Sequence, residues 1–208
     1  MFDAVFFDLD GTLIDTESVA MTAGVQAFAE FGHAVDESFM HQLVGKAEPA
    51  GVEIIRAAYP GLDEAGFSAA WKRGFQAGLE AGVPMKSGAH DLLRAIRQPM
   101  ALVTSTGRTG AHWKLDRAGL TPHFRTIITF DDVTAAKPAP DPYLLAAERL
   151  GVDPARCLVF EDSDVGAEAA HRAGCVVVQV PDVQRTDGRF ARHLAADLWT
   201  GARLAGLL

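Results

Sequence analysis

Short runs of apolar residues recur along the chain, each bounded by polar or turn-forming residues. The first run, Ala4–Phe7, leads into Asp8 and is followed by Gly11. Four similar runs lie at Met100–Thr104, Thr126–Phe130, Cys157–Phe160 and Cys175–Val180. Their apolar residues are nearly continuous rather than alternating with polar ones, which is typical of parallel strands covered on both faces. The pattern therefore predicts a buried parallel sheet.

Stretches with helical signals separate the later strands. Their predicted bounds are Ala111–Ala118, which stops at Gly119, Asp141–Leu150, which stops at Gly151, and a helix capped by Ser163 or Asp164 that ends before Gly174. Asp141-Pro142 offers an N-cap and a proline at the first helical position, and a glycine just after a helix commonly ends it. Alternation of strands and helices is typical of an α/β fold with a parallel sheet.

One long segment interrupts this alternation. From about Asp15 to Gly82 we find only helical periods, at Thr16–Phe31, Asp36–Val44, Glu48–Tyr59 and Asp63–Ala81. An all-helical segment directly after the first strand indicates a separate small domain inserted into the sheet-forming chain. We therefore predict an α/β fold, with a Rossmann-like core of residues 1–15 and 84–208 and an all-helical cap domain at residues 16–83.

Composition and charge exclude several classes of protein. The 208 residues are 49% apolar and carry a formal net charge of −8, without a basic tract, which argues against general nucleic-acid binding. No apolar run reaches the roughly 18–20 residues of a membrane-spanning helix. The opening MFDAVFFDLDG has aspartates where a signal peptide has basic residues, so we expect a cytoplasmic protein. Cys157 and Cys175 lie in apolar runs and are expected to be buried, reduced thiols.

The first predicted strand ends in two carboxylates, those of Asp8 and Asp10, in the sequence Asp-Leu-Asp-Gly-Thr. In an open parallel sheet the carboxyl ends of the strands face the ligand crevice. Two carboxylates at this spacing can divide labour: one attacks phosphorus or binds a metal ion, and the other exchanges a proton with the leaving group. Taken alone, the pentapeptide has an ordinary alternative as a turn with an aspartate that caps a helix.

Three further sites carry polar groups suited to the same chemistry. Thr104 and Ser105 end the second strand, where hydroxyl and backbone N–H groups can hold phosphoryl oxygens. Lys137 lies in Ala-Lys-Pro-Ala-Pro, just before a capped helix. Glu161 and Asp162 directly follow another strand, and carboxylates are the ligands that Mg²⁺ prefers. Each alone has an ordinary alternative as a helix cap or a solvated charge, but all are expected at one edge of the sheet.

Together these residues resemble the motifs of the haloacid dehalogenase superfamily, in the subclass with a helical cap inserted after the first motif. The first motif is similar to Asp8-Leu9-Asp10-Gly11-Thr12, the second to Thr104, the third to Lys137, and the fourth to Glu161-Asp162-Ser163 with Gly166. The resemblance spans almost the whole chain, and the combination is much more specific than any single motif.

The resemblance implies a catalytic role for each matched residue. Asp8 would attack phosphorus in line and form an aspartyl phosphate. Asp10 would protonate the leaving alkoxide and then activate water. Thr104, with Ser105 beside it, would bind a phosphoryl oxygen, and Lys137 would neutralise charge shared by Asp8 and the phosphate.

The resemblance also implies a magnesium site. Mg²⁺ would be bound by Asp8, the backbone carbonyl of Asp10 and Asp162, with Glu161 assisting directly or through water. The physical chemistry agrees, because a carboxylate repels a phosphate dianion and attack therefore needs cations that cancel the repulsion.

Several reactions occur on this fold, and the residues discriminate among them. Dehalogenases of the superfamily lack an aspartate at the position of Asp10, so its presence favours phosphoryl chemistry. The segment around Lys137 is very similar to β-phosphoglucomutases, but these carry a histidine four residues after a hinge threonine. Here Thr16 is followed at that spacing by Ala20.

We therefore favour a Mg²⁺-dependent phosphatase that hydrolyses a small phosphate monoester, a sugar phosphate or similar metabolite. A β-phosphoglucomutase-type phosphomutase is the alternative. A catalytically idle binding module would be expected to lose Asp8 or Asp10, and both are present.

The predicted cap is where we expect substrate selectivity, because such caps close over the site and exclude water. Glu17, just past the first hinge, and Lys46, directly after Gly45, are the candidate substrate contacts. A small lid favours a small-molecule phosphate ester over a phosphoprotein. A monomer is the commonest state in the superfamily and is what the resemblance implies here.

Overall fold

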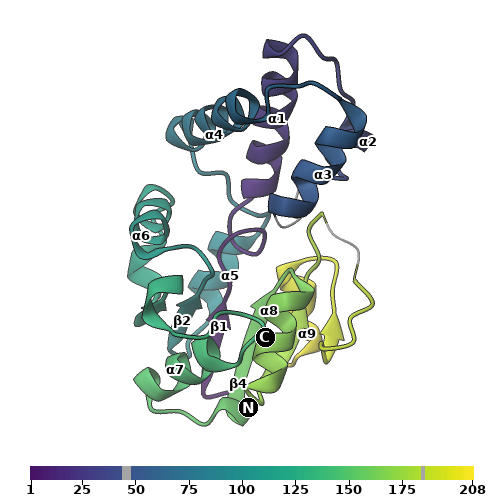
Figure 1. Cartoon of the computed structure of the whole chain (residues 1–208). Coiled ribbons are helices and arrows are strands. Elements are labelled where there is room, and N and C mark those ends of the chain that lie inside the picture. Colours follow the sequence, from purple (N-terminus) through teal and green to yellow (C-terminus); the bar gives the residue numbers. More distant parts are fainter. Residues whose placement is uncertain (44–47, 184–185) are drawn as a thin grey trace. The chain divides into compact units, whose positions relative to one another are not determined.

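The computed structural model describes residues 1–43, 48–183 and 186–208. It divides into two compact units (Figure 1). One unit is formed by Met1–Ile14 together with Met85–Leu208, and the other by Asp15–Pro84. The chain thus leaves the first unit directly after its first strand and returns to it about seventy residues later.

The first unit is built on a parallel sheet with the strand order β3-β2-β1-β4-β5-β6. Its strands are β1 (Ala4–Phe7), β2 (Met100–Val103), β3 (Thr126–Ile128), β4 (Cys157–Glu161), β5 (Val176–Gln179) and β6 (His193–Leu194). The central strands β1, β2 and β4 are buried along their whole length, as their continuous apolar runs predict. The predicted fold class is confirmed: a parallel sheet with a helical insertion between β1 and β2.

Helices cover both faces of this sheet. They are α5 (Ala89–Ala95), α6 (Arg108–Arg117), α7 (Asp141–Leu150), α8 (Asp164–Arg172) and α9 (Leu198–Leu204), with short 3₁₀ turns η1 (Thr121–His123), η2 (Phe130–Asp132) and η3 (Pro154–Arg156). Helices α7 and α8 share an apolar cluster with Phe6 and Val159 of the central strands. Gly201 of α9 instead approaches Val178 and Phe160, which alternate with the first set and so point to the opposite face.

The strand register brings the ends of β1 and β4 together. Phe7 is the partner of Phe160, and the two rings stack at 4.9 Å between centroids. The backbone N–H of Asp8 continues the ladder by donating to the carbonyl of Phe160 at 3.0 Å. Asp8, directly after β1, and Glu161, the last residue of β4, therefore lie next to each other at the carboxyl ends of adjacent strands.

Some predicted elements differ from the structure. The helix predicted from Asp36 to Val44 is only four residues long, because α2 covers Glu37–Met40 and a turn follows it; Val44 lies outside the described residues. Helices α5 and α9 and strand β6 have no counterpart among the predicted elements. They have seven, seven and two residues, and periodicity is a weak signal over such lengths.

The regular elements among the described residues of the second unit are all helices: α1 (Thr16–Glu30), α2, α3 (Glu48–Ala58) and α4 (Glu64–Ala81). Asp15, Asp36 and Asp63 cap helices α1, α2 and α4 through their side chains. No helix within the described ranges of the chain combines the length and the apolar character that crossing a membrane requires.

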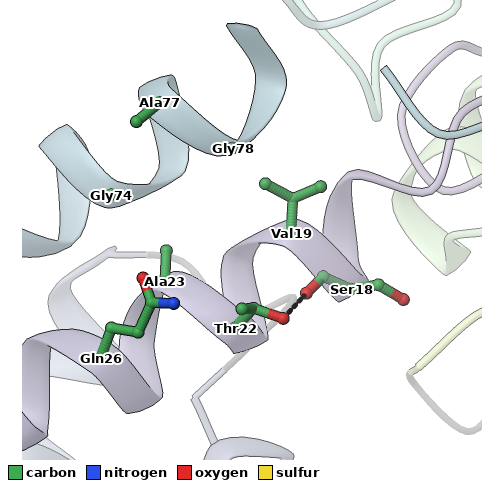
Figure 2. Close-up of a pocket in the computed structure, with 8 residues that line it drawn as sticks. All are labelled: Ser18, Val19, Thr22, Ala23, Gln26, Gly74, Ala77 and Gly78. Carbon is green, nitrogen blue, oxygen red and sulfur yellow. Dashed lines mark hydrogen bonds between the residues drawn. The ribbon is translucent and has the colours of Figure 1, made fainter. Parts of the chain in front are cut away.

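Small residues allow α1 and α4 to lie side by side (Figure 1). A Cβ atom on Gly74 of α4 would lie 3.2 Å from the Cβ of Ala23 in α1, and one on Gly78 would lie 2.7 Å from Val19. These residues line a hollow of about 340 Å³. Figure 2 shows them on the two helices. Close approach of the two backbones therefore depends on residues without bulky side chains.

Gly24 of α1 tests this packing. An added Cβ would clash with the end of Met40 and lie 2.9 Å from the ring of Trp71, whose Nε1 donates to the carbonyl of Ala20 at 2.8 Å. Overpacking costs about 1–3 kcal/mol, more than the helix-propensity gain of about 1 kcal/mol from replacing glycine. We therefore expect Gly24→Ala to lower the free energy of unfolding, measured by urea denaturation.

Gly51→Ala is the matched control in the same unit. Gly51 lies in α3, and outside that helix none of the residues that the structure describes has an atom within 4 Å of its added Cβ, so the variant gains helix propensity without a clash among them. We expect it to be neutral or more stable by up to about 1 kcal/mol. Equal stabilities of the two variants would contradict the packing described for α1.

Candidate active site

Asp8 and the turn after it form one side of the site. The carboxyl group of Asp8 is almost fully buried, since the residue is 7% exposed. Gly11 follows with φ of +83°, a backbone conformation that side chains rarely permit, and an added Cβ would lie 2.5 Å from Oδ2 of Asp162. Glycine is therefore needed for the turn that places the end of β1 against Asp162.

Lys137 joins two carboxylates inside the site. Its Nζ donates to Oδ1 of Asp8 at 2.7 Å, to Oε1 of Glu161 at 2.6 Å and to the carbonyl of Val103 at 2.9 Å. These contacts use all three hydrogens of the ammonium group. Burial alone would lower the pKa of Lys137, but the carboxylates of Asp8 and Glu161 outweigh it and raise this pKa above its usual value.

Glu161 is completely enclosed. Its Oε1 also accepts from the hydroxyl of Tyr143 at 2.5 Å, and its Oε2 accepts from the hydroxyl of Ser163 at 3.3 Å. Burial, followed by the charge of Glu161, raises the pKa of Tyr143 well above its usual value, which keeps the phenol protonated as a donor. A side chain on Gly166, in the first turn of α8, would clash with the carboxylate of Glu161, so this position requires glycine.

Three carboxylates lie near Lys137, those of Asp8, Glu161 and Asp162. Oxygens of Asp8, Glu161 and Asp162 lie within 4.8 Å of one another. Burial is the largest cause that raises the pKa of Asp8 to about 7; Lys137 opposes it and Glu161 adds to it. Burial, then the charges of Asp8 and Glu161, raises the pKa of Asp162 well above its usual value. One ammonium facing three carboxylates leaves a deficit of positive charge, which an oxygen-binding divalent cation would fill.

Asp10 makes a different set of contacts, with residues that follow β2. Its Oδ1 accepts from Nζ of Lys114 at 2.6 Å, and its Oδ2 accepts from the hydroxyl of Thr106 at 2.6 Å. The backbone N–H of Thr106 in turn donates to Oγ1 of Thr104 at 3.0 Å. The loop after β2 therefore connects Thr104 to Asp10.

The predicted site residues of the first unit are placed as follows. Lys137 contacts Asp8 and Glu161, and the carboxylate of Asp162 lies beside those of Asp8 and Glu161. Asp10 contacts Thr106, in the loop that begins with Thr104. The side chain of Thr104 is buried. Ser105 lies in the same loop and is exposed. The roles of these residues stay predictions until they are measured.

Of the two substrate contacts predicted in the cap, one lies among the described residues. Glu17 lies in the first turn of α1, and its contact with substrate stays a prediction. Lys46 lies outside the described residues.

Five polar residues that contact the described site were not predicted as site residues: Thr12, Thr106, Lys114, Tyr143 and Ser163. Thr12 belongs to the first motif, and its hydroxyl donates to Oδ1 of Asp162 at 3.3 Å. Thr106 closely follows a predicted residue. Lys114 and Tyr143 lie within helices, where the sequence alone offers no signal that separates them from surface and packing residues.

Comparisons with known proteins agree on one family. Residues 2–174 match the model of the haloacid dehalogenase-like hydrolases. A phosphorylated carbohydrates phosphatase from Thermotoga maritima is 33% identical over 83% of this chain and 82% of that protein. The fructose-1-phosphate phosphatase YqaB of Escherichia coli is 32% identical over 86% of this chain and 96% of that protein.

Solved structures show the same architecture. A HAD family hydrolase from Deinococcus radiodurans with bound phosphate and sodium is 30% identical, with a TM-score of 0.86 over 100% of this chain and 97% of that one. A putative β-phosphoglucomutase from Thermotoga maritima is also 30% identical, with a TM-score of 0.83 over 99% of this chain and 100% of that one. The chain thus belongs to the haloacid dehalogenase-like hydrolase family, in its branch with a helical cap, and as an enzyme it is a phosphoric monoester hydrolase of that family.

Proposed function

We propose that this phosphatase hydrolyses a small phosphate monoester, a sugar phosphate or similar metabolite, with Mg²⁺ and through an aspartyl phosphate on Asp8. The observation that carries the proposal is the environment of Asp8. Its carboxylate is buried, one oxygen is bonded to the buried ammonium of Lys137, and two further carboxylates lie beside it. Such an arrangement supports a nucleophile that receives an anionic substrate together with a cation.

The charges of the cluster fit Mg²⁺. Asp8 and Asp162 would bind the ion with the backbone carbonyl of Asp10, and Glu161 would assist directly or through water. Glu161 already accepts from Lys137 and Tyr143, which favours the indirect role. When bound, Mg²⁺ supplies the positive charge that offsets repulsion between carboxylate and phosphate.

The first chemical step forms one bond and breaks another. With Oδ1 of Asp8 bonded to Lys137, Oδ2 is the oxygen that attacks phosphorus. An O–P bond to Asp8 forms as the ester O–P bond breaks. Asp10 gives its proton to the leaving oxygen, which departs as an alcohol.

The second step restores the enzyme. Asp10, now a carboxylate, takes a proton from a water molecule as the water oxygen attacks phosphorus. The acyl-phosphate bond to Asp8 breaks, inorganic phosphate leaves, and both aspartates return to their starting states.

Two residues complete the phosphate site in this proposal. Oγ1 of Thr104 accepts from the N–H of Thr106, so its own hydrogen remains to be donated to a phosphoryl oxygen. Lys137, held in place by three contacts, offers fixed positive charge without reorganisation during the reaction.

Names of relatives support a sugar phosphate as the substrate class. Proteins at 32–34% identity include the phosphorylated carbohydrates phosphatase, the fructose-1-phosphate phosphatase and a hexitol phosphatase. Glu17 and Lys46 remain our proposed contacts from the cap to the part of the substrate that is not phosphate.

A phosphomutase is the second candidate, and similarity to the putative β-phosphoglucomutase favours it. Against it stands Ala20, whose methyl side chain cannot donate a hydrogen bond where mutases carry a histidine. We expect phosphate release from glucose 6-phosphate, or from other sugar phosphates, to exceed interconversion of the glucose phosphates. Conversion of glucose 1-phosphate to glucose 6-phosphate without phosphate release would favour the mutase.

Asp8→Asn tests the nucleophile. The amide cannot form the acyl phosphate, so we expect kcat for phosphate release from a panel of sugar phosphates with Mg²⁺ to fall by about a thousandfold or more. Asp91→Asn is the control, because Asp91 is an exposed residue of α5 outside the site. Retention of activity in Asp8→Asn would rule out Asp8 as the nucleophile.

Asp162→Asn tests the metal site without an activity assay. The raised pKa of Asp162 means that the folded metal-free protein binds more protons than the unfolded chain, so stability falls as pH rises above about 4. At pH 8 we therefore expect metal-free Asp162→Asn to unfold at a higher temperature than the wild type. Mg²⁺ at about 100 times its Kd should stabilise the wild type by about 2.7 kcal/mol, and the variant much less at the same concentration.

Asp132→Asn is a control of opposite sign. Burial alone would raise the pKa of Asp132, but hydrogen bonds from Thr129, Arg149 and Arg108 together outweigh it and hold this pKa below its usual value. Replacing the carboxylate of Asp132 should therefore lower the unfolding temperature at pH 8, and stabilisation by Mg²⁺ should be unchanged. An equal Mg²⁺ effect in the wild type and Asp162→Asn would argue against the proposed metal site.

A further inference from the structure

Asp10 is held at both carboxylate oxygens by side chains outside the matched motifs. Lys114 of α6 donates to Oδ1 and Thr106 donates to Oδ2, each at 2.6 Å. Nζ of Lys114 also lies 3.5 Å from Oγ1 of Thr106, so the three groups form one cluster. The side chain of Lys114 is only 12% exposed, unlike a solvated surface lysine.

The helix that carries Lys114 is anchored at its start. The backbone N–H of Arg108 donates to Asp131 at 2.6 Å, and its guanidinium donates to Asp132 at 2.9 Å. Ala111 and Leu115 of the same helix are fully buried. Lys114 therefore extends toward Asp10 from a fixed base, which favours a persistent contact over a transient surface ion pair.

The two partners of Asp10 differ in what they can accept. An ammonium group only donates hydrogen bonds, so Oδ1 facing Lys114 must remain an acceptor. The hydroxyl hydrogen of Thr106 can rotate away when Oδ2 carries a proton, which leaves that proton free to point at the leaving oxygen. The pair therefore distinguishes the two oxygens of Asp10, although the carboxylate itself is symmetric.

We propose that Lys114 and Thr106 are positioning residues that orient Asp10 and direct the transferred proton to its Oδ2. The inference rests on the proposed function, in which Asp10 protonates the leaving oxygen while the bond from phosphorus to that oxygen breaks. Lys114 touches neither substrate nor phosphorus in this role. Its effect reaches the reaction through the carboxylate of Asp10.

The dependence on the leaving group separates this role from a structural one. A sugar alkoxide leaves only with a proton, phenolate needs one less, and p-nitrophenolate leaves readily without it. For a reaction with a covalent intermediate, kcat/KM covers the steps up to release of the alcohol or phenol and not the later hydrolysis. Loss of proton delivery should therefore lower kcat/KM in proportion to the basicity of the leaving group.

The experiment compares Lys114→Met with the wild type on three esters: p-nitrophenyl phosphate, phenyl phosphate and the sugar phosphate that the wild type hydrolyses fastest. We expect kcat/KM to fall by about 10- to 100-fold for the sugar phosphate, by less for phenyl phosphate, and by less than about threefold for p-nitrophenyl phosphate. Lys114→Arg keeps a donor-only cation and should restore part of the loss. Thr106→Val should show the same pattern of losses in kcat/KM as Lys114→Met. Thr106→Ser should behave like the wild type.

Arg117→Met is the matched control on the same helix. Arg117 is an exposed cation that packs over the ring of Trp113, and its removal should leave the ratios among the esters unchanged. Equal losses on all three esters in Lys114→Met, or no loss on any, would overturn the positioning role. A wild type that hydrolyses none of the esters, with Asp8→Asn indistinguishable from it, would instead overturn the proposed function and this inference with it.

Discussion

The ion pairs of Lys137 are the interaction on which the rest of the candidate site depends. Two carboxylates leave adjacent strands at the same level, and burial makes their charges unfavourable unless a cation faces them. Lys137 meets Asp8 and Glu161 with one ammonium and uses its third hydrogen on the carbonyl of Val103. The loop that carries Lys137 must therefore pack against the ends of β1, β2 and β4, which links the loop to the sheet edge.

The charge that Lys137 leaves unbalanced gives this edge its chemistry. Asp162 adds a third carboxylate, and its pKa and that of Asp8 are raised because burial and their neighbours disfavour the charged forms. A divalent cation relieves this unfavourable charge and at the same time prepares the site for a phosphate dianion. The side chain of Asp10 has its own partners, Lys114 and Thr106, which hold the carboxylate that transfers protons in the proposed mechanism.

The sequence predicts most of the carboxylates at the sheet edge, but not the helix residues that contact and orient them. Asp8, Glu161 and Asp162 are recognisable because each follows a continuous apolar run, and parallel strands bring their carboxyl ends to one edge. Lys114 and Tyr143 are not recognisable in this way. Each lies within a helix whose pattern fits an exposed lysine or a packing aromatic, and only the tertiary packing of α6 and α7 directs them to Asp10 and Glu161.

Identification of the phosphorylated residue tests the mechanism most directly. Asp10→Asn should still release p-nitrophenol from p-nitrophenyl phosphate, because this leaving group needs no proton, but it should hydrolyse the intermediate slowly. Borohydride reduces an aspartyl phosphate to homoserine, so mass spectrometry of the quenched and reduced variant should find homoserine at position 8. An unmodified Asp8 after one equivalent of p-nitrophenol has been released, or homoserine at another aspartate, would contradict covalent catalysis by Asp8.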